Sequence, residues 1–275
     1  FLQTVCPRFG IDVTFVDGTQ PGAFAEAVVP GKTMLVLSET PANPRLDIID
    51  LDALGAIVNA LTVVDSTFAT PMGQTPLAHG VDLVLHSATK GIAGHNDATI
   101  GVVAGSDDLM SWLWGFAVLH GANASPYDAY NAHRGVRTLG VRLRQQAESA
   151  RLLADFLEAH DAVSDVRYPG LASHPQHDLA VRQMQSMGGL LTFDLAGGLE
   201  AGRRFVEATS IARQATSLGG PETLLCHSAT TTHVSPTPEE LEASGIGEGT
   251  VRVTCVLENV DDLGADFGRW LDAAR

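Results

Sequence analysis

The stretch that decides the fold is Val81-Asp82-Leu83-Val84-Leu85-His86-Ser87-Ala88-Thr89-Lys90, a short apolar run that ends in polar residues. The run over residues 61–64 ends in the same way, in Asp65-Ser66-Thr67, and the apolar residues 34–37 lead into the polar segment 38–44. Residues 100–104 form a fourth apolar run. Short apolar runs separated by helix-length segments predict an α/β fold with a mostly parallel sheet, covered by helices on both faces. Ligands bind such sheets outside the carboxyl ends of the strands, which is where these polar residues lie.

The second half of the chain has a different pattern. Residues 142–160 carry apolar side chains at a spacing near 3.6, which predicts a long helix. Further strands are predicted over 190–195 and 251–257, and further helices over 202–208 and 261–274. We therefore expect a large α/β domain over residues 1–133, followed by a smaller α+β C-terminal domain over 134–275.

The composition excludes several classes of protein. The 275 residues include 17 Lys and Arg against 32 Asp and Glu, a formal net charge of −15. Such an acidic chain is not a generic binder of nucleic acid or of anionic membranes, which requires a basic surface. No apolar run approaches about 18 residues, so no membrane span is expected. The cysteines are odd in number and form no C-x-x-C pair, which favours a reducing, cytoplasmic location.

Two histidines are candidate metal ligands. His174 and His177 have the spacing i, i+3, but no further group of candidate ligands accompanies them. Pro175, which lies between them, favours a loop. No metal site is expected.

The chain contains two lysines, Lys32 and Lys90. Lys90 follows an apolar strand, where desolvation lowers the pKa of an amine. A neutral amine can form a Schiff base with an aldehyde, and pyridoxal 5′-phosphate is the aldehyde cofactor that uses this reaction. Asp65 can supply the carboxylate that keeps the cofactor's ring nitrogen protonated, and the hydroxyls of Ser87 and Thr89 can face its phosphate. The alternative is a surface loop with an ordinary lysine and two capping hydroxyls.

Ordered motifs along nearly the whole chain resemble one family, the Cys/Met-metabolism enzymes that depend on pyridoxal phosphate, of the trans-sulfuration group. The motifs are Glu39-Thr40-Pro41-Ala42-Asn43-Pro44, Val63–Pro71, Pro76–Asp82, His86–Lys90, Gly94–Asp97, Arg134–Leu139, Tyr168–Leu171, His174–His177 and Ser217-Leu218-Gly219-Gly220. The resemblance implies the fold of the pyridoxal phosphate-dependent transferases, which is also called the type I aminotransferase-like fold.

The resemblance also implies roles for individual residues. Lys90 is the Schiff-base lysine and proton shuttle, Asp65 pairs with the pyridinium nitrogen, and Ser87 and Thr89 hold the phosphate. Asn43, Ser217 and Arg252 receive the α-carboxylate of the substrate. From the residues alone, Arg252 could equally be the partner of an acidic neighbour, and Asn43, between two prolines, could be a turn residue.

The chain departs from the family in several places. Ser66 stands where the family has Asn after the aspartate, Gly91 where it has an aromatic residue after the lysine, and residues 254–258 lack a common glycine. Three features of the family have no counterpart here: the Gly-rich phosphate loop, the tyrosine that stacks on the cofactor, and a Tyr/Arg pair that contacts the neighbouring subunit's phosphate. The chain is therefore expected to be the later part of a subunit, and to bind the cofactor weakly on its own.

The expected reaction is γ-elimination, a carbon–sulfur lyase activity on methionine-like substrates. Cystathionine-using relatives often have an acidic residue before the serine of Ser-Leu-Gly-Gly, whereas this chain has Thr216. The segments 227–233 and 238–240 also resemble the methionine γ-lyase group. The alternatives are γ-replacement on O-acylhomoserine, a cystathionine γ-lyase, and a non-catalytic relative on the same fold. The resemblance further implies a homotetramer, built as a dimer of dimers.

Overall fold

A computed structural model describes residues 1–232 and 245–273. Its first sheet contains β1 (Leu35–Glu39), β2 (Leu61–Asp65), β3 (Leu83–Ser87) and β4 (Gly101–Gly105), in that spatial order. β1, β2 and β3 pair in parallel and β4 is antiparallel to β3, so the prediction of a mostly parallel sheet is confirmed. The carboxyl ends of the three parallel strands share one edge, where Glu39 lies opposite Asp65 in register.

Short helices precede and connect these strands. They are η1 (Cys6–Phe9), α1 (Ala23–Ala27), α2 (Leu51–Gly55), α3 (Thr70–Gly73) and η2 (Pro76–His79). Val36, Val64 and Val81 pack with Leu51 and Leu54 of α2 into a small core. The prediction that both faces of the sheet are covered does not hold at β1 in the described chain, because Leu35 and Leu37 are 52% and 43% exposed.

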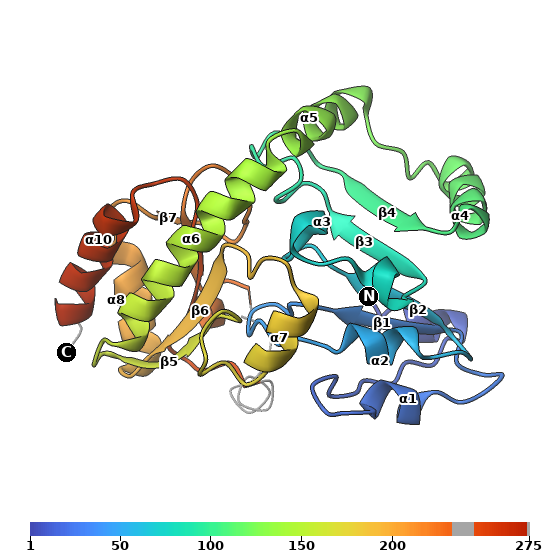
Figure 1. The fold of residues 1–275 in the computed structure, drawn as a ribbon, viewed down its shortest axis with the longest axis horizontal. Helices are drawn as coiled ribbons and strands as arrows, with labels where there is room; N and C mark the ends of the chain where they lie inside the picture. The colour runs from blue at the N-terminus through green and yellow to red at the C-terminus, as the bar shows by residue number, and fades with distance from the viewer. Residues whose placement is uncertain (233–244, 274–275) are drawn as a thin grey trace.

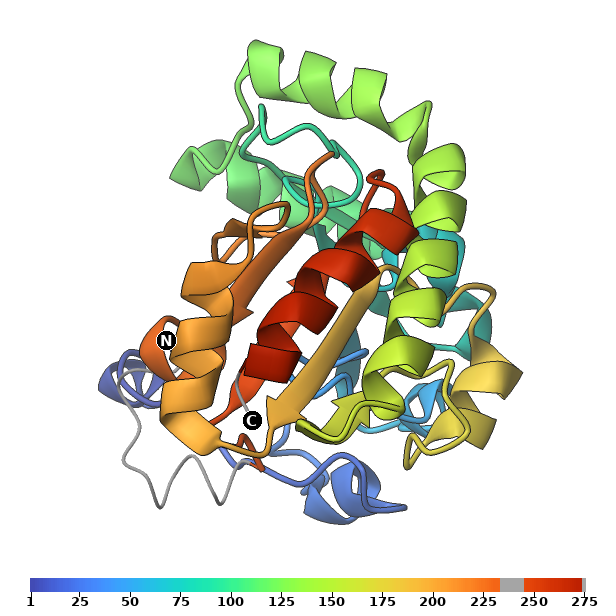
Figure 2. The same ribbon diagram turned by 90° about the vertical axis from the view of Figure 1, so that its left-hand side faces the viewer.

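The second sheet contains β5 (Val163–Arg167), β6 (Leu190–Leu195), β7 (Arg213–Gln214), β8 (Leu224–His227) and β9 (Thr250–Thr254), in the order β5-β6-β9-β8-β7. All its pairings are antiparallel except that of β7 with β8. Figure 2 shows α6 (Leu139–Glu158), α8 (Gly198–Ala208) and α10 (Val260–Ala273) over one face of this sheet. Phe205 is the centre of the core there, with edge-on ring contacts to Phe193 and Phe267.

Two helices, α4 (Asp107–His120) and α5 (Pro126–Val136), link the sheets in the chain, and α6 then runs from α5 to β5 (Figure 1). The remaining elements are α7 (His177–Gln183) and η3 (Ser228–Thr230). The domain boundary predicted at residue 134 falls inside α5, and the division into two domains stays a prediction. No helix among the described residues is long and apolar enough to cross a membrane.

Several predicted boundaries differ from the structure. The strand predicted over 81–85 is β3, which begins later and includes His86 and Ser87 because these two residues pair with β4. The helix predicted from residue 202 begins at Gly198, and the strand predicted over 251–257 ends at Thr254. The end of the last helix at Ala274, His233 and the segment 238–240 lie outside the described residues.

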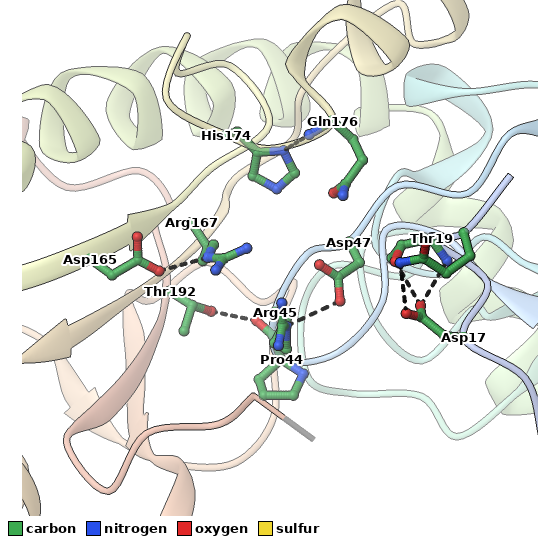
Figure 3. A network of polar contacts seen from close by, with 11 residues as sticks. Asp17, Thr19, Pro44, Arg45, Asp47, Asp165, Arg167, His174, Gln176 and Thr192 are labelled. Carbon is green, nitrogen blue, oxygen red and sulfur yellow. Dashed lines mark hydrogen bonds and ion pairs between the residues drawn. The ribbon is translucent and has the colours of Figure 1, made fainter. Parts of the chain in front are cut away.

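A polar joint connects the segment after β1 with the second sheet (Figure 3). Thr192 of β6 donates its hydroxyl hydrogen to the carbonyl of Pro44 at 2.6 Å. Gln183 of α7 donates to the carbonyl of Ile49 and accepts from the amide of Leu51. These bonds hold the segment that carries Asn43 against the second sheet.

Candidate active site

Lys90 lies in a tight turn directly after β3. Its amide donates to the carbonyl of Ser87 at 3.0 Å, and its carbonyl accepts from the amide of Gly94 at 2.8 Å. The side chain crosses to the segment before β8, where Nζ donates to Oγ of Ser217 at 3.0 Å. Burial and the positive charge of Arg252 lower the pKa of Lys90. The pKa shift is in the direction expected from the sequence, and it raises the fraction of neutral amine at neutral pH.

Asp65, at the end of β2, is oriented by Thr67. Oδ1 of Asp65 accepts the amide hydrogen of Thr67 at 2.9 Å and its hydroxyl hydrogen at 2.5 Å. The hydroxyl of Thr67 in turn accepts from the amide of Ser87 at 2.8 Å. Within the described residues Oδ2 of Asp65 accepts no hydrogen bond, so this oxygen is available to a cationic N–H.

The two predicted phosphate-binding hydroxyls are in different situations. The Ser87 hydroxyl makes no hydrogen bond to the described part of the chain. The Thr89 hydroxyl donates to the carbonyl of Ile100 at 3.3 Å and accepts from its amide at 2.9 Å. Thr89 and Ser217 line a cavity of about 460 Å³ with residues of the 96–99 loop. Thr89 would have to release Ile100 in order to donate to a phosphate.

Arg252, on the central strand β9, is 4% exposed. Nη1 donates to Oδ1 of Asn43 at 2.9 Å, and Nη2 donates to the carbonyls of Thr216 at 2.5 Å and Ser217 at 3.3 Å. Among the described residues the guanidinium therefore has amide and carbonyl partners and no carboxylate. The structure brings Asn43, Ser217, Arg252 and Lys90 together.

Glu39 and Thr67 also lie at this site, although neither residue was predicted from the sequence to be functional. Enclosure by the surrounding protein and the neighbouring Asp65 carboxylate raise the pKa of Glu39 to about 7, although its side chain keeps an exposed face. Glu39 is the last residue of β1, as Asp65 is of β2. This position at a strand end is the sequence feature that could have identified Glu39. Thr67 is two residues after Asp65, the spacing at which a side chain bonds a local carboxylate.

The histidines weighed as metal ligands make other contacts. Nδ1 of His174 accepts from the amide of Gln176 at 3.2 Å, and Nδ1 of His177 lies 2.9 Å from the carbonyl of Pro169. Residues 1–232 and 245–273 contain no group of three or more side chains arranged to hold a metal ion.

These features fit a pyridoxal phosphate cofactor. The cofactor requires an amine that is neutral in part, which Lys90 offers, and a carboxylate with an open oxygen, which Asp65 offers. Ser87 lies between the two in the chain and has an open hydroxyl. Arg252 presents the planar fork that binds a carboxylate. The fold and the site together define a pyridoxal phosphate-dependent enzyme.

Comparison with known proteins gives the family. The family model of Cys/Met metabolism PLP-dependent enzymes matches residues 1–272, and the chain belongs to this family. It is 43% identical to an L-methionine γ-lyase of Porphyromonas gingivalis, over 99% of the chain and 70% of the relative. It is 40% identical to an O-succinylhomoserine sulfhydrylase of Pseudomonas aeruginosa, over 97% of the chain and 66% of the relative.

The solved structures agree. A cystathionine γ-synthase of Xanthomonas oryzae pv. oryzae superposes with a TM-score of 0.93 at 41% identity, covering 99% of this chain and 72% of that one. The family, the aminotransferase-like fold and the dependence on pyridoxal phosphate, all expected from the sequence motifs, are confirmed. The protein is therefore an enzyme of sulfur amino-acid metabolism.

Proposed function

We propose that the protein is a carbon–sulfur lyase that catalyses γ-elimination on methionine-like amino acids. The observation that carries the proposal is the contact of Lys90 Nζ with Ser217, beside the Arg252 guanidinium. This arrangement puts an amine of lowered pKa next to a carboxylate-binding fork. Relatives named as L-methionine γ-lyases support the choice of substrate.

In this proposal each site residue has one task. Lys90 would hold the cofactor through its amine, and the same amine would move protons at Cα and Cβ of the substrate. Asp65 would keep the ring nitrogen protonated through its open oxygen, while Ser87 and Thr89 would hold the phosphate. Asn43, Ser217 and Arg252 orient the substrate carboxylate. The bound cofactor supplies an electron sink for the Cα carbanion.

Lys90 can act as a base because its charge is disfavoured where it lies. Burial and the Arg252 charge both favour the neutral amine. When a substrate carboxylate lies on Arg252, it neutralises part of that charge, so the amine holds a proton more readily. Substrate binding would thus prepare Lys90 to accept the Cα proton.

The residue before Ser217 bears on the substrate. Thr216 is exposed, and its main-chain carbonyl accepts from Arg252, so the residue adjoins the carboxylate fork. A neutral side chain offers no partner for the distal ammonium of cystathionine. This favours methionine-like substrates over cystathionine.

A comparison of substrates tests the reaction. In the full-length enzyme we expect kcat/KM for methionine to exceed that for cystathionine, and release of an α-keto acid and a thiol without any added thiol. A higher kcat/KM for cystathionine would reject the proposed substrate. The second candidate is γ-replacement on O-acylhomoserine, which the similarity to an O-succinylhomoserine sulfhydrylase supports. Activity that depends on added thiol would identify it.

Borohydride trapping tests the site. Reduction of the loaded enzyme followed by peptide mapping should place the cofactor on Lys90. Lys32 is the internal control, because its side chain is 70% exposed and pairs with Asp12. Label on Lys32 or on neither lysine would indicate a non-catalytic relative.

We also propose that the enzyme is a cytoplasmic homotetramer, a dimer of dimers. The buried, unpaired cysteines Cys6, Cys226 and Cys255 support a reducing compartment. The exposed apolar residues of α4 and β4 support association of copies of the chain; they include Val102, Val103, Trp112, Trp114, Phe116 and Leu119. The division into a cofactor domain (1–133) and a C-terminal domain (134–275) is likewise proposed, on the separation of the two sheets.

A further inference from the structure

Arg142, in the first turn of α6, is a buried guanidinium whose hydrogen-bond partners in the described chain are all uncharged. It is 5% exposed. Nη1 donates to the carbonyl of Gly91 at 2.8 Å, and Nη2 to those of Gly135 at 2.9 Å and Ile92 at 3.3 Å. Nε donates to the hydroxyl of Thr138 at 3.1 Å. Burying a charge is costly without such compensation, so these carbonyls are what keeps Arg142 in place.

Two of the three carbonyls belong to the turn that carries Lys90. Within this turn the carbonyls of Ala88 and Lys90 accept from main-chain amides, whereas those of Gly91 and Ile92 accept from Arg142. Gly94 closes the turn with φ +69°, and a Cβ there would lie 2.1 Å from Nη1 of Arg142. The turn is therefore wrapped closely around the guanidinium.

The third carbonyl belongs to α5. Gly135 is in the last turn of that helix, where a cation interacts favourably with the helix dipole. A Cβ at Gly135 would lie 2.0 Å from the carbonyl oxygen of Ala93, so α5 also touches the Lys90 turn. One side chain thus joins the turn, the end of α5 and the start of α6.

The opposite side of the turn faces the substrate-binding segment. A Cβ at Gly219 would lie 2.5 Å from the amide nitrogen of Gly91, so the segment with Ser217 packs directly on the backbone next to Lys90. The same helix α6 packs against β5 and β6 of the second sheet, whose strand β9 carries Arg252. A displacement of the turn would therefore change the position of Lys90 relative to both Ser217 and Arg252.

We propose that Arg142 is a positioning residue for the catalytic lysine: its hydrogen bonds hold the Lys90 turn between α6 and the 217–220 segment and so set the position of Nζ. The inference rests on the proposed role of Lys90. It predicts that loss of Arg142 changes the environment of Lys90 even when no cofactor is bound.

The first experiment uses the cofactor-free, full-length protein. The rate at which an amine-specific reagent labels Lys90 is measured against pH by peptide mapping, in wild type, Arg142→Met and Arg142→Lys. In Arg142→Met we expect the pH midpoint of Lys90 labelling to rise toward that of a solvated lysine. The reason is that the Lys90 side chain leaves its desolvated position beside Arg252. Arg142→Lys should shift the midpoint less, since an ammonium can still donate to Gly91 and Ile92.

The matched control is Arg151→Met on the same helix. Arg151 also donates to a carbonyl, that of Gly170 at 2.7 Å, but it lies away from the Lys90 turn. This variant should label Lys90 as wild type does. If Arg142→Met does not fold, Arg142→Lys, which keeps the charge but loses the fork, tests the proposal by a smaller shift in the same direction.

The second experiment uses the holoenzyme. In Arg142→Met we expect kcat per bound cofactor to fall on the order of 10²-fold, as for a misplacement of about 1 Å, with KM nearly unchanged. An unchanged labelling midpoint together with an unchanged kcat would overturn the proposal and leave Arg142 a structural role alone. If borohydride does not trap the cofactor on Lys90, the proposed function fails, whereas the labelling midpoint still decides the role of Arg142.

Discussion

One hydroxyl joins two residues of the site that bind different parts of the cofactor in the proposed function. Thr67 donates to Oδ1 of Asp65 and accepts from the amide of Ser87. The first bond leaves the other oxygen of Asp65 for the ring nitrogen. The second fixes the backbone from which the Ser87 hydroxyl projects. Thr67 therefore couples the ring-binding and phosphate-binding ends of the site at the scale of a single residue.

Replacement of Thr67 by Val tests this coupling. The variant leaves the Ser87 amide without its partner and removes one of the two bonds that orient Asp65, a loss of roughly 1–3 kcal/mol. We expect the affinity for pyridoxal phosphate to fall about tenfold or more, as measured by titration of the cofactor's absorbance. Thr67→Ser keeps the hydroxyl and should bind nearly as wild type does. Equal affinities of the Val and Ser variants would contradict the role of the hydroxyl.

At the scale of elements, the segment after β1 is held to the second sheet by the polar joint of Figure 3. Two ion pairs lie at this joint, each within one segment: Arg45 with Asp47 at 3.2 Å after β1, and Arg167 with Asp165 at 2.6 Å in β5. His174, 3% exposed, lies beside these groups. Burial, and secondly the Arg167 charge, lower the pKa of His174 to about 4. The surroundings of His174 therefore favour its neutral imidazole.

The joint should therefore be sensitive to acid. The unfolded chain takes up a proton at its ordinary histidine pKa near 6.5, whereas folded His174 does so only near 4, so stability is lost as the pH falls through this window. By pH 5 the loss should be on the order of 2 kcal/mol in urea unfolding. His174→Gln should lose less stability than wild type between pH 7 and pH 5.

The control for this comparison is His177→Gln, three residues further on at the start of α7 and partly exposed. It should follow the wild-type pH dependence. If His174→Gln lost as much stability between pH 7 and pH 5 as wild type, the neutral, buried state of His174 would be refuted.

At the scale of the whole molecule, α4 exposes several large apolar side chains. None of its residues is buried, and Trp112, Phe116 and Leu119 follow one another at helical spacing, 69%, 52% and 84% exposed. Phe116 stacks between Trp112 and His120, so the face is ordered without a covering element. A second copy of the chain, as in the proposed homotetramer, would remove this surface from water.

Charge placed on this helix should weaken the assembly. We expect Trp112→Glu and Leu119→Glu to shift the full-length enzyme from a tetramer to smaller species in sedimentation, because a carboxylate would have to be desolvated in the interface. Val58→Glu is the control, since Val58 is 86% exposed but precedes β2, whereas α4 packs against β4. Unchanged sedimentation of both α4 variants would exclude this helix from the interface.

The sequence by itself determined the class of fold, the four strands of the first sheet and the polar residues at the strand ends. Apolar runs and helical spacing are local patterns, and a polar residue directly after a buried strand marks the ligand-binding edge of a parallel sheet. Lys90 and Asp65 were found in this way. The bounds of β3 and the start of α8 were predicted wrongly. β3 extends to Ser87 because it pairs with β4, and α8 begins after its N-cap residue Gly197, and neither feature is a local apolar pattern.

The tertiary structure alone decided how these residues meet. Lys90 and Ser217 are 127 residues apart in the chain, and Arg252 and Asn43 are 209 apart. Their contacts depend on how α6 joins the two sheets and on the glycines that allow backbones to touch, and neither leaves a periodic signal in the sequence. Arg142 shows the difference most clearly, because a buried arginine bonded to carbonyls looks in the sequence like any arginine of an amphipathic helix.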